Sequence, residues 1–180
     1  MSTWKLDPAH SQIEFAVRHM MVTTVRGQFH KFAVTLDFDE AHPERSTVEA
    51  HIDASSIDTG MEARDTHLRS ADFFDAAVYP ELAFHSTSIK RSHDGYKIAG
   101  DLTIHGKTKP VTLDAEIGGV VPNMQGGRRA GFSASTKISR KEWGLTWNGA
   151  LESGGVLVSD DVKISMDLAV LQPEAVAGVH

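Results

Sequence analysis

The clearest pattern along the chain is an alternation of apolar and polar side chains. Ile13, Phe15 and Val17 alternate with polar or small neighbours, and this period of two is typical of a half-buried β-strand. The same pattern recurs in seven further segments: 32–38, 48–52, 82–89, 96–104, 111–117, 129–139 and 161–170. Turn signals separate them, namely Asp94-Gly95, His105-Gly106, Gly118-Gly119, Gly126-Gly127 and Ser153-Gly154-Gly155. The pattern predicts a mainly β protein with about eight strands in an antiparallel barrel or sandwich.

One segment, from Thr59 to Asp75, breaks this alternation. Met61 and Leu68 lie seven positions apart, on one face of a helix. The segment therefore predicts a single amphipathic helix at about 60–74, with Asp58 or Thr59 as its N-cap. In a β protein such a helix either plugs one end of a barrel or covers an exposed sheet edge, and the pattern does not choose between them.

Composition and charge narrow the classes of function. The chain has 180 residues, so we expect one domain over 1–180. The net charge of -6 argues against nucleic acid as a partner and against docking on an anionic membrane by charge alone. The apolar runs are only a few residues long, so no integral membrane segment is expected. The N-terminus has no basic segment followed by an apolar one, which predicts a cytoplasmic protein.

Motifs that would support catalysis fail on inspection. The absence of cysteine excludes disulfides, cysteine-based metal sites and thiol chemistry. Gly106-Lys107-Thr108 looks like the end of a phosphate-binding loop, but Asp101 stands where that motif needs its first glycine. His42-Pro43-Glu44 begins a zinc deaminase signature whose second half requires cysteines. We therefore predict that the chain is not an enzyme.

The ten histidines are the one compositional feature that suggests chemistry. No two of them have the i,i+2 or i,i+4 spacing of a ligand pair on one strand or helix, so no metal ion is predicted. His19 is of interest because it is in phase with the apolar positions Phe15 and Val17 and is expected to face the interior.

Several sequence blocks, in a fixed order, resemble the YceI family. They are Trp4-x-Leu6-Asp7-x-x-His10-Ser11-x-Ile13-x-Phe15-x-Val17-x-His19, Val25-Arg26-Gly27-x-Phe29, Arg64-Asp65-x-His67-Leu68-x-Ser70-x-Asp72-Phe73-Phe74-Asp75, Gly100-Asp101-Leu102-Thr103-Ile104-His105-Gly106-x-Thr108-x-Pro110-Val111 and Arg140-x-x-x-Gly144-Leu145. The resemblance runs over nearly the whole chain and places the core of the domain at about 4–170.

This resemblance implies an elongated, lipocalin-like antiparallel barrel whose interior holds a long isoprenoid lipid. A polyprenyl phosphate or an isoprenoid quinone would be the ligand, and no cofactor is implied. Family members often dimerise, so a homodimer is expected. Many members are secreted to the periplasm behind a signal peptide, and this chain departs from them there. The departure favours an intracellular carrier or sequestering role.

The predicted ligand-binding residues are those expected to face the interior, together with three polar candidates for a lipid head group. The first set is Phe15, Val17, His19, Val34, Leu36, Leu68, Phe84, Leu102, Ile104, Phe132, Ile138, Ile164 and Met166; the head-group candidates are Arg26, Arg64 and His67. We predict non-catalytic binding, transport or storage of the lipid. Three alternatives stay open: an enzyme on a lipophilic substrate with His19 as acid or base, a packed barrel that acts only through its surface, and metal binding by some of the ten histidines.

Overall fold

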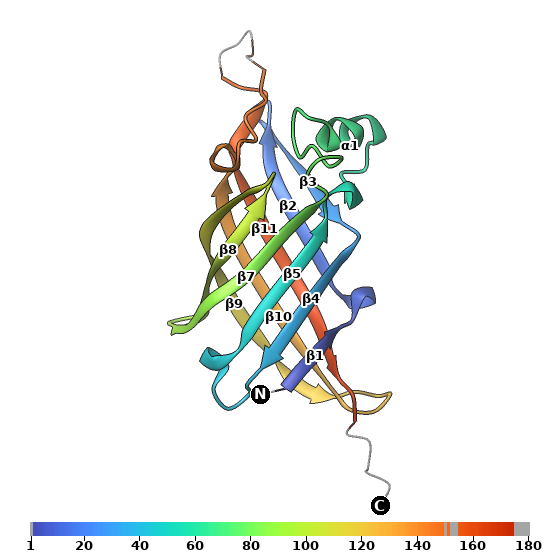
Figure 1. Ribbon diagram of the computed structural model, residues 1–180, viewed down its shortest axis with the longest axis vertical. Coiled ribbons are helices and arrows are strands. Elements are labelled where there is room, and N and C mark those ends of the chain that lie inside the picture. Colours follow the sequence, from blue (N-terminus) through green and yellow to red (C-terminus); the bar gives the residue numbers. More distant parts are fainter. Residues whose placement is uncertain (1, 150, 152–154, 175–180) are drawn as a thin grey trace, which may run out of the picture.

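The computed structural model describes residues 2–149, 151 and 155–174. In this part of the chain, eleven strands form one antiparallel sheet (Figure 1). The strands are β1 (Ser2–Leu6), β2 (Gln12–His19), β3 (Thr23–Phe29), β4 (Phe32–Phe38), β5 (Thr47–Asp53), β6 (Ile57–Asp58), β7 (Glu81–Ser92), β8 (Gly95–Ile104), β9 (Lys107–Pro122), β10 (Arg128–Ser139) and β11 (Val158–Gln172). One α-helix, α1 (Glu62–Arg69), and four short 3-10 helices accompany them: η1 (Pro8–His10), η2 (Pro43–Arg45), η3 (Ala54–Ser56) and η4 (Arg140–Trp143).

Eight of the described strands close into a ring, in the order β1, β4, β5, β7, β8, β9, β10 and β11. The ring closes because β11 has two partners along one edge. Its last residues pair with β1, Lys5 opposite Leu171, and its earlier residues pair with β2, Ile13 opposite Met166. Strands β3 and β6 continue the sheet beyond β2. The prediction of a mainly β, closed antiparallel barrel with about eight strands and one helix is confirmed.

The alternation in the sequence becomes the inner and outer faces of this barrel. In β4 the residues Val34, Leu36 and Phe38 are buried inside, whereas Ala33 and Thr35 are exposed. Neighbouring strands are in matching register, so that inward residues meet inward residues around the ring. Burying each such aliphatic or aromatic side chain contributes about 1.5–3 kcal/mol to folding.

The predicted turns are correct at one hairpin and wrong at another glycine pair. His105 and Gly106 connect β8 to β9 with φ angles of 55° and 71°, the type I′ geometry that suits a two-residue hairpin. Gly118-Gly119, in contrast, lies inside β9. The register shifts there, with Gly119 opposite Gly131 and Ile117 opposite Phe132, which marks a β-bulge instead of a turn.

The other glycine signals lie in connections. Asp94 is in the turn before β8, and Gly126-Gly127 is in the connection from β9 to β10, where the Asn123 amide donates to the Gly127 carbonyl at 2.9 Å. Ser153 and Gly154 lie outside the described residues.

Helix α1 is shorter than predicted and begins later. Its N-cap is Met61, without a side-chain cap, in place of Asp58 or Thr59. Thr59 instead donates from its amide and its hydroxyl to the buried Asp65 carboxylate, at 2.9 and 2.5 Å. This contact anchors the first turn of the helix from the loop that precedes it.

The helix ends at Arg69, and Ser70 caps its last turn by hydrogen-bonding to a carbonyl of that turn. The Ser70 amide and hydroxyl both donate to the His67 carbonyl, at 3.1 and 2.5 Å. The chain then turns and brings Phe73 and Phe74 against the barrel interior. In Figure 1 the helix lies at the upper end of the barrel. The structure therefore supports the end-plug interpretation.

No helix in the described part of the chain combines the length and apolar character required to cross a lipid bilayer.

Candidate ligand-binding cavity

Many side chains that point into the barrel are only partly buried. Phe15, Val162, Ile164, Met166 and Leu168 all pack against the core, yet none of them is fully enclosed. In a barrel filled by its own side chains, central residues of this size would lose nearly all contact with solvent-sized space. The interior is therefore hollow, which contradicts the packed-barrel interpretation.

The hollow consists of two adjoining cavities along the barrel axis. The lower cavity, toward β1, has a volume of about 90 Å³ and the upper cavity, toward α1, about 140 Å³, and each is partly open to solvent. Four residues line both of them: Ala50, Phe84, Leu113 and Met166. We call these four residues the waist. The cavities together span most of the length of the barrel.

The lining is almost entirely apolar. In the upper cavity the polar residues of the lining are Glu14, Thr136 and Arg140, and the side chain of Glu14 is exposed on the outer phase of β2. In the lower cavity, Phe38, Ile98 and Phe132 are typical of the wall. A concave site with this lining takes an apolar ligand and offers few groups to hold a polar one.

Gly100 gives the Phe84 ring space at the waist. Ala50 on β5 lies directly opposite Phe84 on β7. The Phe84 ring lies over Gly100 of β8 so closely that a Cβ atom at position 100 would stand 2.4 Å from Phe84 Cζ. Because position 100 is glycine, the Phe84 ring can pack directly against the backbone of β8 at this point.

Arg140 is the one charged side chain buried in the lining. It is 4% exposed, and its guanidinium donates to four carbonyl oxygens: Leu145 at 2.6 Å, Ser159 and Trp147 at 2.9 Å, and Val158 at 3.3 Å. Burial lowers the pKa of Arg140 from its ordinary value, and the nearby Asp160 opposes this shift. An arginine has five N–H donors, so one N–H remains beyond these four contacts. Arg140 links the end of β10 to the start of β11, and its guanidinium is directed at these carbonyls while the surface of the upper cavity stays apolar.

Twelve of the predicted ligand-binding residues line the two cavities. They are Phe15, Val17, Val34, Leu36, Leu68, Phe84, Leu102, Ile104, Phe132, Ile138, Ile164 and Met166. They come from six strands and one helix, β2, β4, α1, β7, β8, β10 and β11, and the barrel brings them onto one wall.

The other four predicted residues are not among those that line either cavity in the described chain. His19 is half-buried at the end of β2, and Arg26 is exposed on β3. Arg64 donates to the hydroxyl and the carbonyl of Thr59, at 2.7 and 2.8 Å. His67 Nε2 lies 2.8 Å from the Asp72 carboxylate, and its ring packs edge-on against Trp147.

Sequence reasoning missed Arg140, Phe73 and Phe74 as residues of the wall. Arg140 continues the inward phase of β10, two positions after Ile138 and four after Thr136, so the period of two carries the signal that identifies it. Phe73 and Phe74 carry no such signal, because they reach the cavity through the turn after α1.

A closed antiparallel barrel of eight strands around an apolar cavity belongs to the class of ligand-holding barrels that includes the lipocalins. Within this class, the model of the YceI-like domain matches residues 4–170. The chain belongs to the YceI-like family.

Individual relatives agree with this assignment over most of the chain. A UPF0312 protein of Staphylococcus aureus (strain USA300) is 40% identical over 164 residues, which cover 91% of this chain and 94% of the relative. The crystal structure of Burkholderia cenocepacia BcnA has a TM-score of 0.78 and 27% identity, over 91% of this chain and 98% of that one. A polyisoprenoid-binding domain from Saccharophagus degradans shares the fold, with a TM-score of 0.62 and 15% identity over 94% and 98% of the two chains.

Proposed function

We propose that this chain binds a long isoprenoid-type lipid inside its barrel, without catalysis, and thereby transports or stores it. The observation that carries this proposal is the pair of adjoining apolar cavities that share Ala50, Phe84, Leu113 and Met166. Two apolar cavities that adjoin at the waist suit a long, thin and flexible ligand that occupies both better than a compact one. The name of the Saccharophagus domain, polyisoprenoid-binding, supports the choice of ligand class.

Most of the binding free energy is expected to come from the length of the lipid chain. Burying one five-carbon prenyl unit contributes about 3–4 kcal/mol, at roughly 0.8 kcal/mol per carbon. Association costs on the order of 4–15 kcal/mol in lost freedom, so several units are needed for micromolar affinity. Affinity is therefore expected to rise with prenyl length until the ligand fills both cavities.

The twelve lining residues named above are the proposed wall contacts. For the polar end of the ligand, Arg140 is the proposed partner, because it is a buried charged residue of the upper cavity's lining, and an N–H of its guanidinium would turn from the carbonyls toward the ligand. An arginine N–H can donate to a phosphate oxygen or to a quinone oxygen, and its charge favours the phosphate. Arg26, Arg64 and His67 stay predictions for this role. His19 as a ligand contact, the homodimer and the cytoplasmic location also stay predictions.

Native mass spectrometry tests the proposal directly. Untagged protein is freshly purified, measured intact, and then titrated with a series of polyprenyl phosphates and quinones of increasing chain length. We expect a co-purified isoprenoid, or uptake of one added lipid per barrel with affinity that rises along the series. A flat series, or a protein that takes up none of these lipids, would overturn the proposal and favour an enzyme or a surface-acting barrel.

A further inference from the structure

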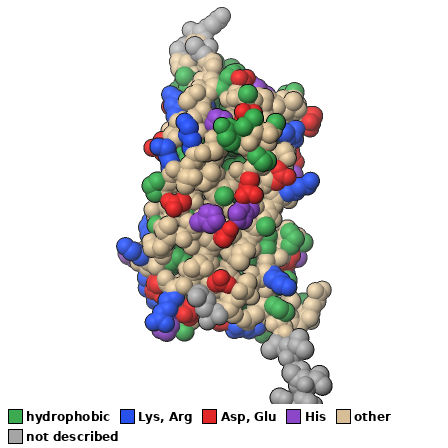
Figure 2. Space-filling view, in the orientation of Figure 1, with side chains coloured by type: hydrophobic (Ala, Val, Ile, Leu, Met, Phe, Trp, Pro, Cys, Tyr) green, Lys and Arg blue, Asp and Glu red, His purple; other side chains and the backbone are tan. Residues whose placement is uncertain are grey.

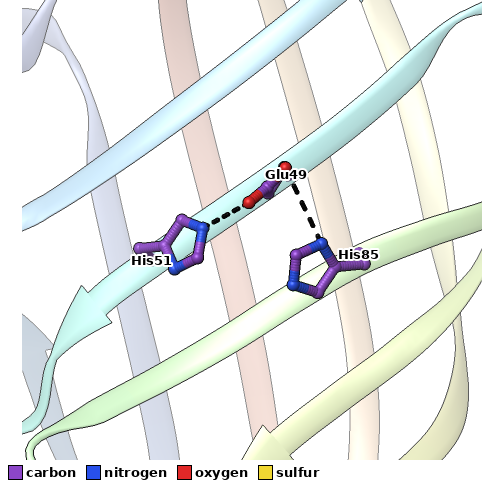
Figure 3. A group of neighbouring side chains, drawn as sticks. All are labelled: Glu49, His51 and His85. Atoms are coloured by element: carbon purple, nitrogen blue, oxygen red, sulfur yellow. Dashed lines mark hydrogen bonds and ion pairs between the residues drawn. The ribbon is translucent and has the colours of Figure 1, made fainter.

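A group of metal-ligating side chains stands on the outer wall of the barrel, away from the cavities. Glu49 and His51 belong to β5, and His85 belongs to the neighbouring β7 (Figure 3). Glu49 lies directly opposite His85 in the register of the two strands, and His51 follows Glu49 two positions later on the same face. Figure 2 shows histidine and acidic side chains gathered at mid-height of the barrel, over these strands.

The geometry brings the three side chains toward one point. One oxygen of the Glu49 carboxylate lies 2.5 Å from His51 Nε2, and its other oxygen lies 3.7 Å from His85 Nδ1. The two imidazole rings meet edge to face, with centroids 5.7 Å apart. One potential ligand atom from each residue falls within 4.8 Å of the other two. Two imidazoles and one carboxylate form a donor set that Zn²⁺ uses in sites with three protein ligands.

A second carboxylate orients one of these ligands. Glu81, at the start of β7, has a carboxylate oxygen 2.6 Å from His51 Nδ1. This contact leaves His51 Nε2 as the nitrogen directed at Glu49. Metal-ligating histidines usually pair their other ring nitrogen with a carboxylate or carbonyl in this way. Glu81 is therefore placed as an outer partner that fixes the orientation of the imidazole.

The surroundings leave room for an ion and for water. The cross-strand neighbours of His51 are Ala33 on β4 and Ala83 on β7, both small. The side chains of Glu49, His51 and His85 are 47%, 41% and 52% exposed, so they can rotate to close the remaining distance. Solvent is available on the same side to supply a fourth ligand.

We propose that Glu49, His51 and His85 form a site for a divalent transition-metal ion, with Zn²⁺ as the preferred probe and water as the fourth ligand. The ion would replace the proton between His51 Nε2 and Glu49, and that proton would pass to solvent. Imidazole ligands favour Zn²⁺ and Cu²⁺ over Ca²⁺ and Mg²⁺, which prefer oxygen. The site does not depend on the lipid proposal, because its ligands point away from the cavities.

Isothermal titration calorimetry, in which Zn²⁺ is titrated into untagged protein, tests this site. We expect one Zn²⁺ per chain, bound in the micromolar range. Co²⁺ loading should give the visible absorption of a four-coordinate ion. His51→Ala and His85→Ala should each weaken Zn²⁺ binding by about 100-fold or more. Glu81→Gln should weaken it by a smaller factor, about tenfold.

Matched controls separate this cluster from the other histidines. His93→Ala removes an exposed histidine from the turn before β8, where its Nδ1 lies 3.1 Å from the Asp94 carboxylate. This variant is expected to bind Zn²⁺ as the wild type does. The melting temperature of each metal-free variant confirms that it is folded. No bound Zn²⁺, equal loss in His93→Ala, or unchanged binding in both His51→Ala and His85→Ala would each overturn the proposal.

Discussion

The two faces of β5 and β7 differ in chemistry although they belong to the same two strands. On the inner face, Ala50 and Phe84 form part of the apolar waist between the cavities. On the outer face, Glu49, His51 and His85 place two imidazoles and a carboxylate within reach of one ion. The two sets alternate along each strand, so adjacent residues serve opposite sides of a wall one strand thick.

This contrast shows how a barrel carries two independent sites on one pair of strands. Hydrogen bonding between β5 and β7 sets the register for both faces at once. A shift of one residue would bring His51 and Glu49 into the cavity and expose Ala50 and Ile52 to water. The apolar interior therefore stabilises the same register that assembles the outer cluster.

The prediction with the largest expected effect concerns Arg140, a charged side chain that is buried on the inner side of the barrel. Arg140→Met keeps the bulk of the side chain but removes four hydrogen bonds and leaves buried carbonyls unpaired. We expect a loss of about 3 kcal/mol in the free energy of unfolding, measured by urea denaturation.

Lys137→Met on the outer face of β10 is the matched control for this variant. Lys137 pairs with Asp161 at 3.2 Å, and both side chains are more than half exposed. Its replacement is expected to change stability by about 0–1 kcal/mol. Equal effects of the two variants would mean that the inner and outer charges are equivalent.

The next test narrows the waist. Ala50→Phe adds a ring opposite Phe84, where the two cavities join. We expect the affinity for long isoprenoids to fall by about 30-fold, or roughly 2 kcal/mol, while short ones are affected much less. Fluorescent-lipid displacement with a long and a short ligand measures both affinities.

Ala16→Phe makes the same substitution on the outer phase of β2, where Ala16 stands between the inward residues Phe15 and Val17. It should leave both affinities unchanged. If both variants weaken long and short lipids alike, the ligand does not pass through the waist.

A smaller effect tests whether the two faces act independently. Zn²⁺ at ten times its dissociation constant should raise the stability of the wild type by about 1.4 kcal/mol, because the ion binds the folded chain alone. Thermal unfolding should show this gain in the wild type and its loss in His51→Ala. The lipid affinity of His51→Ala should equal that of the wild type, and a change in it would show that the faces are coupled.

The smallest effect concerns a charge at the lower end of the barrel. Asp7 is 12% exposed and contacts His10 Nδ1 at 2.8 Å and the Arg129 guanidinium at 2.5 Å. Desolvation raises its pKa, but the hydrogen bond and charge of His10 and the charge of Arg129 outweigh it, so the pKa of Asp7 is lowered.

Because this pKa is lower in the folded state, the carboxylate stabilises the fold above its unfolded pKa of about 3.9, and the benefit disappears as the pH falls through the lower folded value. Asp7→Asn should therefore be less stable than the wild type at pH 7 and should converge with it in strong acid. Urea denaturation across this pH range measures the difference. A gap that persists in strong acid would assign the effect to packing instead of charge.

Alternation predicted most of the barrel because inward and outward residues obey a period of two whatever strand lies next to them. It did not predict β3, whose apolar phase is interrupted at Gly27. A Cβ atom there would stand 2.3 Å from Cζ of Phe15, so glycine at this position leaves room for the Phe15 ring on the neighbouring strand. Local patterns contain no trace of such a cross-strand contact, and the same holds for the bulge at Gly118-Gly119.

The period of two that predicts the strands also predicts most residues of the cavity wall. It does not predict the outer cluster of Glu49, His51 and His85. Spacing among the histidines gives no sign of a ligand set, because His51 meets Glu49 on its own strand and His85 across a register set by the fold. The head-group candidates Arg64 and His67 were chosen by residue type alone. In the structure, their hydrogen bonds go to Thr59 and Asp72.

The pairing that closes the ring joins Lys5, near the start of the chain, to Leu171, near its end. Until β11 has been synthesised, β1 can pair only with β4, and the hollow interior stays open along one side. Contacts between such distant positions form slowly, because a long loop must first be closed. During synthesis, the apolar wall of the barrel therefore stays exposed along one side until β11 has been added. Truncation within β11 is expected to leave an unclosed sheet that aggregates through its exposed edge instead of a smaller barrel.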